Sequence, residues 1–143
     1  MAAQFSLLGL LFLKPRATVL MTLSWASGLA FVLDVVALAI LFAAWYALRP
    51  SLRISPIPKE GAVLITTGIY SFIRHPMYVG VLLFGAGFVL TNITWISISI
   101  WAALFITLVY KARFEDSLLS IKHPQATAYQ SKTIGLFGKK VED

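Results

Sequence analysis

Residues 77–110 have the sequence MYVGVLLFGAGFVLTNITWISISIWAALFITLVY, and no charged side chain interrupts them. An uncharged apolar run of about 18 residues or more is typical of a membrane-spanning helix. This run is too long for a single span, and Thr91 and Asn92 lie near its midpoint. We therefore predict a tight helical hairpin whose two ends return to the same face of the membrane.

The composition extends this interpretation to the whole chain. Of the 143 residues, 59% are hydrophobic and 13% are charged, whereas soluble domains have roughly 45–50% and 25%. Residues 17–33 and 35–48 also carry no charge. We predict an all-α, multi-pass integral membrane protein with about four transmembrane helices, the last two forming the hairpin.

Residues 17–48 raise a problem of length, because as one helix they would extend about 48 Å against a hydrocarbon core of about 30 Å. Either one long helix tilts or projects from the membrane, or two short helices turn near residues 27–28 or at Asp34. The second arrangement places the basic residues before and after residues 17–48 on the same side of the membrane. The bias of Lys and Arg toward cytoplasmic loops favours this arrangement. We therefore expect two helices.

The formal net charge of +6 comes from Lys and Arg side chains that gather between the apolar runs. This distribution is typical of cytoplasmic loops rather than of a nucleic-acid site. The chain has no cysteine, which excludes disulfides, thiolate nucleophiles and cysteine metal ligands, and we predict no metal site. One domain, residues 1–143, comprises N-terminal apolar helices in 1–48, a polar loop in 49–76, the hairpin in 77–113 and a cytosolic tail in 114–143.

A polar segment enters the hairpin: residues 68–80 have the sequence GIYSFIRHPMYVG. Pro76 suits the first turn of a helix, so Arg74 and His75 should lie just outside the helix N-terminus. Unpaired backbone N–H groups at that position favour an anionic ligand group. Ionisable side chains beside a membrane helix are costly and tend to mark function, although juxtamembrane cations and tyrosines also serve as simple interfacial anchors.

A second charged cluster, KARFED at residues 111–116, follows the second helix of the hairpin. It should therefore return to the membrane face that carries the first cluster. On a helix, Lys111 and Glu115 are four residues apart and Arg113 and Asp116 are three apart, so each pair could be mutual neighbours. We interpret the glycines of the hairpin as helix-packing positions rather than as a phosphate cradle.

The pattern Gly-x-Tyr-x-x-x-Arg-His-Pro-x-Tyr-x-Gly at residues 68–80, with the acidic pair after the hairpin, resembles the isoprenylcysteine carboxyl methyltransferase family and the related phospholipid methyltransferases. The resemblance covers residues 49–129. It implies S-adenosyl-L-methionine as cofactor, in a pocket at the cytosolic membrane face. The positions that it implies for cofactor binding are Ala62, Val63, Leu64, Ile65, Tyr70, His75, Pro76, Met77, Tyr78 and Glu115.

The sequence departs from the family pattern at a few positions. Ile69 stands where proline is usual, Asp116 replaces a second glutamate, and Ala126 replaces a common aromatic residue. The substrate-orienting arginine of the family corresponds to Lys111, and Arg113 lies two residues further on. The candidate catalytic residues are therefore Arg74, Lys111 and Arg113, with the choice between the last two left open.

The expected reaction is an in-line transfer of a methyl group to a lipophilic acceptor that enters from the bilayer. The acceptor could be a prenylcysteine-type carboxylate, a phospholipid amine or another small hydrophobic molecule. Two alternatives stay open: a membrane sterol-type reductase that uses NADPH, whose family has a similar Arg-His-Pro-x-Tyr stretch but favours asparagine at the position of Met77, and a non-catalytic membrane scaffold. We expect membrane lipids and no nucleic acid as partners, in a bacterial or archaeal inner membrane rather than the endoplasmic reticulum. The oligomeric state is left open.

Overall fold

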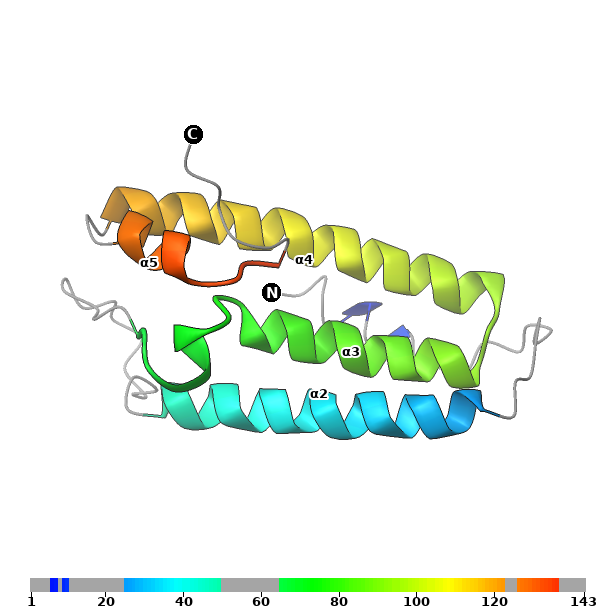
Figure 1. Cartoon of the computed structure of the whole chain (residues 1–143). Coiled ribbons are helices and arrows are strands. Elements are labelled where there is room, and N and C mark those ends of the chain that lie inside the picture. The colour runs from blue at the N-terminus through cyan, green and yellow to red at the C-terminus, as the bar shows by residue number, and fades with distance from the viewer. Residues whose placement is uncertain (1–5, 8, 11–24, 50–64, 123–125, 137–143) are drawn as a thin grey trace.

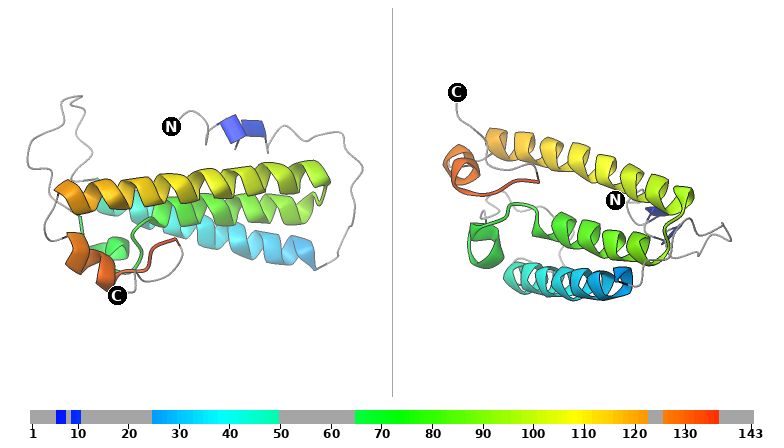
Figure 2. Two further views of the ribbon diagram at one scale, coloured as in Figure 1. Left: turned by 90° about the horizontal axis from the view of Figure 1, so that it is seen from above. Right: turned by 45° about the vertical axis from the view of Figure 1, so that its right-hand side comes forward.

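The computed structural model describes residues 6–7, 9–10, 25–49, 65–122 and 126–136. Three long helices lie side by side, each antiparallel to the next: α2 (Ala26–Leu48), α3 (Pro76–Thr91) and α4 (Trp95–Lys122) (Figure 1). A short 3-10 helix, η1 (Gly68–Ser71), precedes α3, and α5 (Ala126–Lys132) follows α4. Figure 2 shows α5 at the C-terminal end of α4, close to η1. The described residues are therefore essentially all helical, as predicted.

Helix α2 begins at Ala26, close to the first of the two expected turn positions, and it continues through Asp34, which excludes a turn there. Its 23 residues extend about 34 Å, close to the thickness of a hydrocarbon core of about 30 Å. The Asp34 side chain lies against Gly87 of α3, where a Cβ atom would overlap Asp34 Oδ1. Residues 11–24 lie outside the described part of the chain.

Helices α2 and α3 pack through small residues. The buried residues of α2 are all alanines, and they recur mainly at intervals of seven; they are Ala26, Ala30, Ala37 and Ala44. On α3, Gly80 lies against the Ala37 carbonyl and Gly87 against the Ala30 carbonyl. Without side chains at these positions the two backbones approach closely, which is how membrane helices commonly associate.

The helical hairpin is confirmed, with its turn where it was predicted. Helix α3 ends at Thr91, and α4 begins three residues beyond the following Asn92, at Trp95. Thr94 and Ser97 exchange hydrogen bonds, since each side-chain oxygen accepts the backbone N–H of the other residue at 3.0 Å. This reciprocal pattern is a capping box, which starts a helix at a defined residue.

Helices α3 and α4 run side by side and antiparallel from this turn to the site (Figures 1 and 2). Trp101 lies against Gly85 and donates a hydrogen bond from Nε1 to the Leu82 carbonyl at 3.0 Å. Leu82, Leu104 and Leu108 form the apolar core between the helices. Helix α4 continues to Lys122, beyond the expected hairpin boundary at residue 113, so the tail begins as helix.

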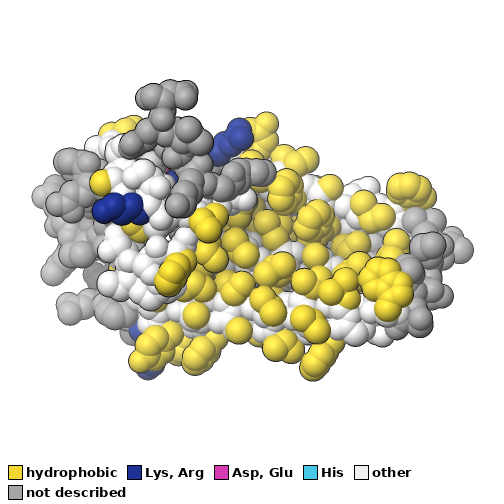
Figure 3. All heavy atoms as spheres, viewed as in Figure 1, with side chains coloured by type: hydrophobic (Ala, Val, Ile, Leu, Met, Phe, Trp, Pro, Cys, Tyr) yellow, Lys and Arg dark blue, Asp and Glu magenta, His cyan; other side chains and the backbone are white. Residues whose placement is uncertain are grey.

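Two of the described helices, α2 and α4, are long and apolar enough to cross a membrane. Only 17% and 22% of their apolar windows are buried inside the chain, so most of this surface faces outward. Figure 3 shows apolar side chains over the length of the bundle and Lys and Arg side chains toward the end that carries α5. The predicted total of about four spans depends largely on residues outside the described part.

We predict that Gly80→Ala destabilises the bundle. A Cβ atom at position 80 would lie 2.7 Å from Leu41 Cγ and 3.3 Å from the Ala37 carbonyl oxygen, and such overpacking typically costs about 1–3 kcal/mol. The unfolding temperature of the detergent-purified protein should fall. Gly28→Ala is the matched control, because a Cβ atom there meets nothing within 4 Å and alanine favours a helix over glycine. Equal unfolding temperatures for the two variants would contradict the close approach of α2 and α3.

Candidate functional site at the membrane face

The loop before α3 places Arg74 and His75 at the helix N-terminus, as the sequence predicted. Gly68 has a φ of 63°, a conformation that glycine adopts without strain, and it starts η1. His75 is the N-cap of α3, and Pro76 occupies the first helical turn. The backbone N–H groups of Tyr78 and Val79 both donate to the His75 carbonyl at 3.1 Å.

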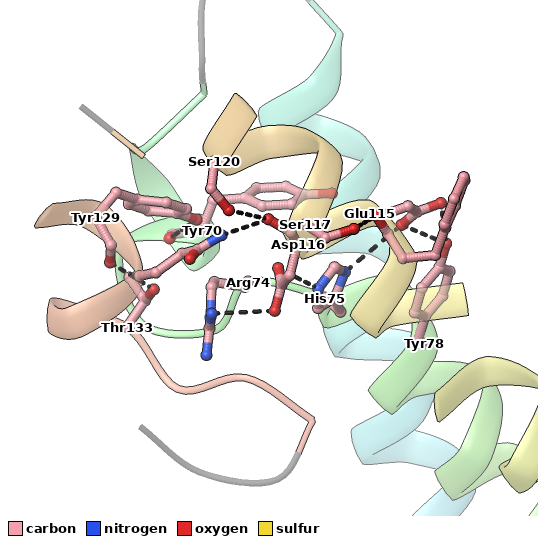
Figure 4. Close-up of polar contacts among 12 residues, drawn as sticks. Tyr70, Arg74, His75, Tyr78, Glu115, Asp116, Ser117, Ser120, Tyr129 and Thr133 are labelled. Atoms are coloured by element: carbon pink, nitrogen blue, oxygen red, sulfur yellow. Dashed lines mark hydrogen bonds and ion pairs between the residues drawn. The ribbon is translucent and has the colours of Figure 1, made fainter. Parts of the chain in front are cut away.

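Asp116 of α4 holds both of these side chains (Figure 4). Arg74 Nη1 donates to one carboxylate oxygen at 3.0 Å, and His75 Nε2 lies 3.0 Å from the other. The Arg74 side chain is only 6% exposed, so Asp116 compensates a buried cation. An ionised carboxylate has acceptors only, which places a proton on His75 Nε2.

Glu115 holds a second set of contacts beside the first. Tyr78 donates its hydroxyl hydrogen to the Glu115 carboxylate, with both oxygens 2.7 Å away. Lys111 Nζ lies 3.8 Å from Glu115, which confirms the expected pair at a spacing of four residues. His75 Nδ1 also lies 3.8 Å from this carboxylate. The Glu115 side chain is nevertheless 42% exposed and therefore accessible to a ligand.

The aromatic ring of Tyr78 links these residues further. It is parallel to the His75 ring, with centroids 5.3 Å apart and an interplanar angle of 2°. Lys111 Nζ lies 5.1 Å from the Tyr78 ring centroid, within the range of a cation–π interaction. The side chains of His75, Tyr78, Lys111 and Glu115 thus form one contiguous cluster at the start of α3.

The two candidate cations on α4 occupy different faces of the helix. Lys111 is half-buried and faces Tyr78, on the side of α4 that also buries Leu104 and Leu108. Arg113 is exposed, as are the apolar residues Tyr110 and Phe114 beside it. The structure therefore brings Lys111 into the cluster and does not place Arg113 there.

The remaining residues predicted to bind the cofactor differ in their burial. Ile65 and Tyr70 are half-buried, Pro76 is buried, and Met77 is 42% exposed at the N-terminus of α3. The described residues do not include Ala62, Val63 and Leu64, which were also predicted to bind the cofactor.

Sequence reasoning missed the C-terminal segment, residues 126–136. Tyr129 donates a hydrogen bond to the Tyr70 carbonyl at 2.7 Å, and Gln130 Nε2 donates one to the Asp116 carbonyl at 2.9 Å. Burial raises the pKa of the Tyr70 and Tyr129 phenols above their ordinary value, so both stay neutral at physiological pH. No charge or apolar periodicity in these residues indicated the contacts; the only signal was the pair of polar side chains at 129 and 130.

The backbone of the same segment pairs with the loop before α3. The Arg74 N–H donates to the Ile134 carbonyl at 3.0 Å, and the Ile134 N–H donates to the Phe72 carbonyl at 2.8 Å. These bonds form an isolated parallel bridge between Ile73 and Ile134. These bonds hold the loop against a segment that lies about 60 residues later in the chain.

Residues 55–125 match a family model described as phospholipid methyltransferase. Over these residues the chain belongs to the phospholipid methyltransferase family. The match contains both charged clusters, so the side chains that meet in the structure lie within the family region. No curated protein and no solved structure gave a significant match.

Membership of the phospholipid methyltransferase family assigns the chain to a class of membrane methyltransferases, a family that includes the isoprenylcysteine carboxyl methyltransferases. The two long apolar helices agree with a location in a membrane. The C-terminal residues Tyr129, Gln130 and Ile134 lie beyond the matched region.

We predict that Asp116→Asn destabilises the protein, because it removes the carboxylate charge that lies 3.0 Å from the buried Arg74 cation. Breaking a fully buried pair costs about 3–5 kcal/mol, and we expect about 2 kcal/mol here since Asp116 is partly exposed. Thermal unfolding in detergent measures the change. Ser117→Ala is the control because, among the described residues, this exposed hydroxyl donates only to the Phe114 carbonyl. A charge-swapped double variant, Arg74→Asp with Asp116→Arg, should recover only part of the loss, since arginine accepts no hydrogen bond from His75.

Proposed function

We propose that this protein transfers a methyl group from S-adenosyl-L-methionine to a lipophilic acceptor at the membrane face. The observation that carries the proposal is the exposed Glu115 carboxylate, held by Tyr78 and Lys111 beside His75. An accessible carboxylate among cationic and aromatic groups suits a ligand that carries both positive and negative charge. The family match supports methyl transfer rather than the reductase alternative.

The position of the cluster along α4 supports a membrane-bound acceptor. Glu115 lies about 20 residues after Trp95, the first residue of α4, and therefore about 30 Å from the hairpin turn. This distance equals the thickness of a typical hydrocarbon core, about 30 Å. A lipophilic acceptor could thus keep its apolar part in the bilayer while its reacting group reaches the cluster.

The chemistry of the side chains fits the proposed cofactor. S-adenosyl-L-methionine supplies, when bound, a methyl group on a sulfonium centre. Glu115 can accept hydrogen bonds from amino or ribose groups, and the N-terminus of α3 can hold a carboxylate, to which His75 donates only when Nδ1 is also protonated. The Tyr78 ring already has His75 and Lys111 as partners, so Tyr78 contributes mainly by orienting Glu115.

The residues of the chain contribute position and charge rather than covalent catalysis. In such transfers, much of the rate acceleration comes from holding the two reactants in line and from excluding water. A carboxylate acceptor needs no general base at neutral pH, whereas an amine acceptor must lose a proton. His75 keeps its proton at Nε2 toward Asp116, so Nδ1 is the nitrogen available to take one.

Isothermal titration of the detergent-purified protein with S-adenosylhomocysteine tests the proposal, with NADPH as the comparison ligand. We expect saturable binding of S-adenosylhomocysteine alone. Binding of NADPH alone would move the protein to the reductase class. Binding of neither ligand by demonstrably folded protein would favour a non-catalytic scaffold.

Single substitutions then test the site itself. His75→Ala and Glu115→Ala should each weaken S-adenosylhomocysteine binding by about 100-fold, equivalent to roughly 2.7 kcal/mol, while the protein stays folded. Ser117→Ala, on the same helix, should retain the affinity of the parent. Unchanged affinity in both site variants would refute the assignment of His75 and Glu115.

The choice between the two cations is tested by a matched pair of variants, Lys111→Met and Arg113→Met. Since Lys111 faces the cluster and Arg113 does not, the first should lower methyl transfer more than the second. The measurement is incorporation of a labelled methyl group from S-adenosyl-L-methionine into lipid extracted from membranes that contain each variant. A larger loss with Arg113→Met would reverse the assignment.

A further inference from the structure

The C-terminal segment contacts both partners of the buried ion pair through their backbones. On one side, the Arg74 N–H donates to the Ile134 carbonyl at 3.0 Å. On the other side, Gln130 Nε2 donates to the Asp116 carbonyl at 2.9 Å. Because Arg74 and Asp116 also meet through their side chains at 3.0 Å, the loop, α4 and the C-terminal segment form a closed set of three contacts.

Gln130 makes the connection to α4 from a buried position. The residue is 1% exposed, and an amide buried without a hydrogen bond would be costly. Ser120 also donates to the Asp116 carbonyl, at 2.7 Å, but from within α4. Among the described residues, Gln130 thus reaches the Asp116 backbone from outside that helix.

The same segment fixes the loop at two further points. Tyr129 donates to the Tyr70 carbonyl at 2.7 Å, and the Ile134 N–H donates to the Phe72 carbonyl at 2.8 Å. A displacement of the C-terminal segment from α4 would therefore change the separation between the loop and Asp116. That separation determines whether His75 Nε2 can donate to the carboxylate.

We infer that Gln130 is a positioning residue of the candidate site. By joining the C-terminal segment to the Asp116 backbone, it keeps Asp116 at hydrogen-bond distance from His75 and so holds the His75 proton on Nε2. The expected effect on S-adenosylhomocysteine affinity rests on the proposed function, whereas the effect on the His75 proton does not. Gln130 lies beyond the matched family region, which ends at residue 125.

Nitrogen-15 NMR of labelled histidine tests this role directly. The chain has two histidines, so a His123→Gln background leaves the signals of His75 alone. Two charged groups of α4, Asp116 and Glu115, face His75. Lys111 lies on the far side of Glu115, and Arg74 directly precedes His75 in the chain. In Gln130→Met, which removes the donor at similar volume, the spectrum of the Nε2-protonated ring should give way to a mixture of tautomers.

Ligand binding provides the second measurement. Loss of one buried hydrogen bond that orients the site should raise the dissociation constant of S-adenosylhomocysteine about tenfold. Ser131→Ala is the matched control, because within the described part of the chain this neighbouring side chain donates only to the Ala128 carbonyl of α5. It should leave both the His75 spectrum and the affinity unchanged.

The outcomes separate the two proposals. A folded Gln130→Met protein with the parent's His75 spectrum would overturn the positioning role, whatever the parent binds. A parent that binds no S-adenosylhomocysteine, but whose His75 spectrum changes in Gln130→Met, would refute the proposed function and support the positioning role. If Gln130→Met does not fold, Gln130→Asn withdraws the amide donor from the Asp116 carbonyl by shortening the side chain, and an unchanged His75 spectrum in that variant would overturn the proposal equally.

Discussion

A cation that is buried beside a membrane needs a compensating charge within the protein, and the geometry of this chain follows from that requirement. The Arg74 side chain is 6% exposed, and Asp116 supplies the opposite charge at 3.0 Å. The two residues are 42 positions apart, so they meet only if the hairpin closes and the loop folds back over α4. The second oxygen of Asp116 then orients His75, and the neighbouring Glu115 receives Tyr78 and Lys111.

The apolar part of the molecule keeps this arrangement at one end of the bundle. Alanines of α2 and glycines of α3 bring the two helices close together. Trp101 and the leucines between α3 and α4 maintain the contact near the hairpin turn. The charged residues therefore gather at the N-terminus of α3, beside η1 and α5, where the Glu115 side chain is 42% exposed.

Local sequence signals were sufficient for about half of this description. The hairpin, its turn at Thr91 and Asn92, the position of Pro76 and the Lys111–Glu115 pair depend on residue type and on spacing along one helix, and all four are confirmed. The approach of the two charged clusters also followed from the hairpin alone.

Other features depend on how elements rotate and pack, and the sequence did not specify them. The space that the Asp34 side chain of α2 occupies depends on Gly87 of another helix. Which carboxylate holds Arg74, and whether Lys111 or Arg113 faces the cluster, depends on the rotation of α4 about its axis. The contacts of Gln130 and Ile134 join segments with no shared pattern, and only the folded chain brings them together.

The length of α4 makes the chain sensitive to the thickness of its membrane. Its polar turn and its charged cluster are separated by a rigid helix, so the two cannot adjust independently to the two interfaces. In a thicker bilayer the helix must stand upright or draw the cluster toward the hydrocarbon, and in a thinner one it must tilt or expose the cluster to water. Lipid composition would thus change how far the proposed lipophilic acceptor must rise from the bilayer to reach Glu115, independently of the acceptor's own chemistry.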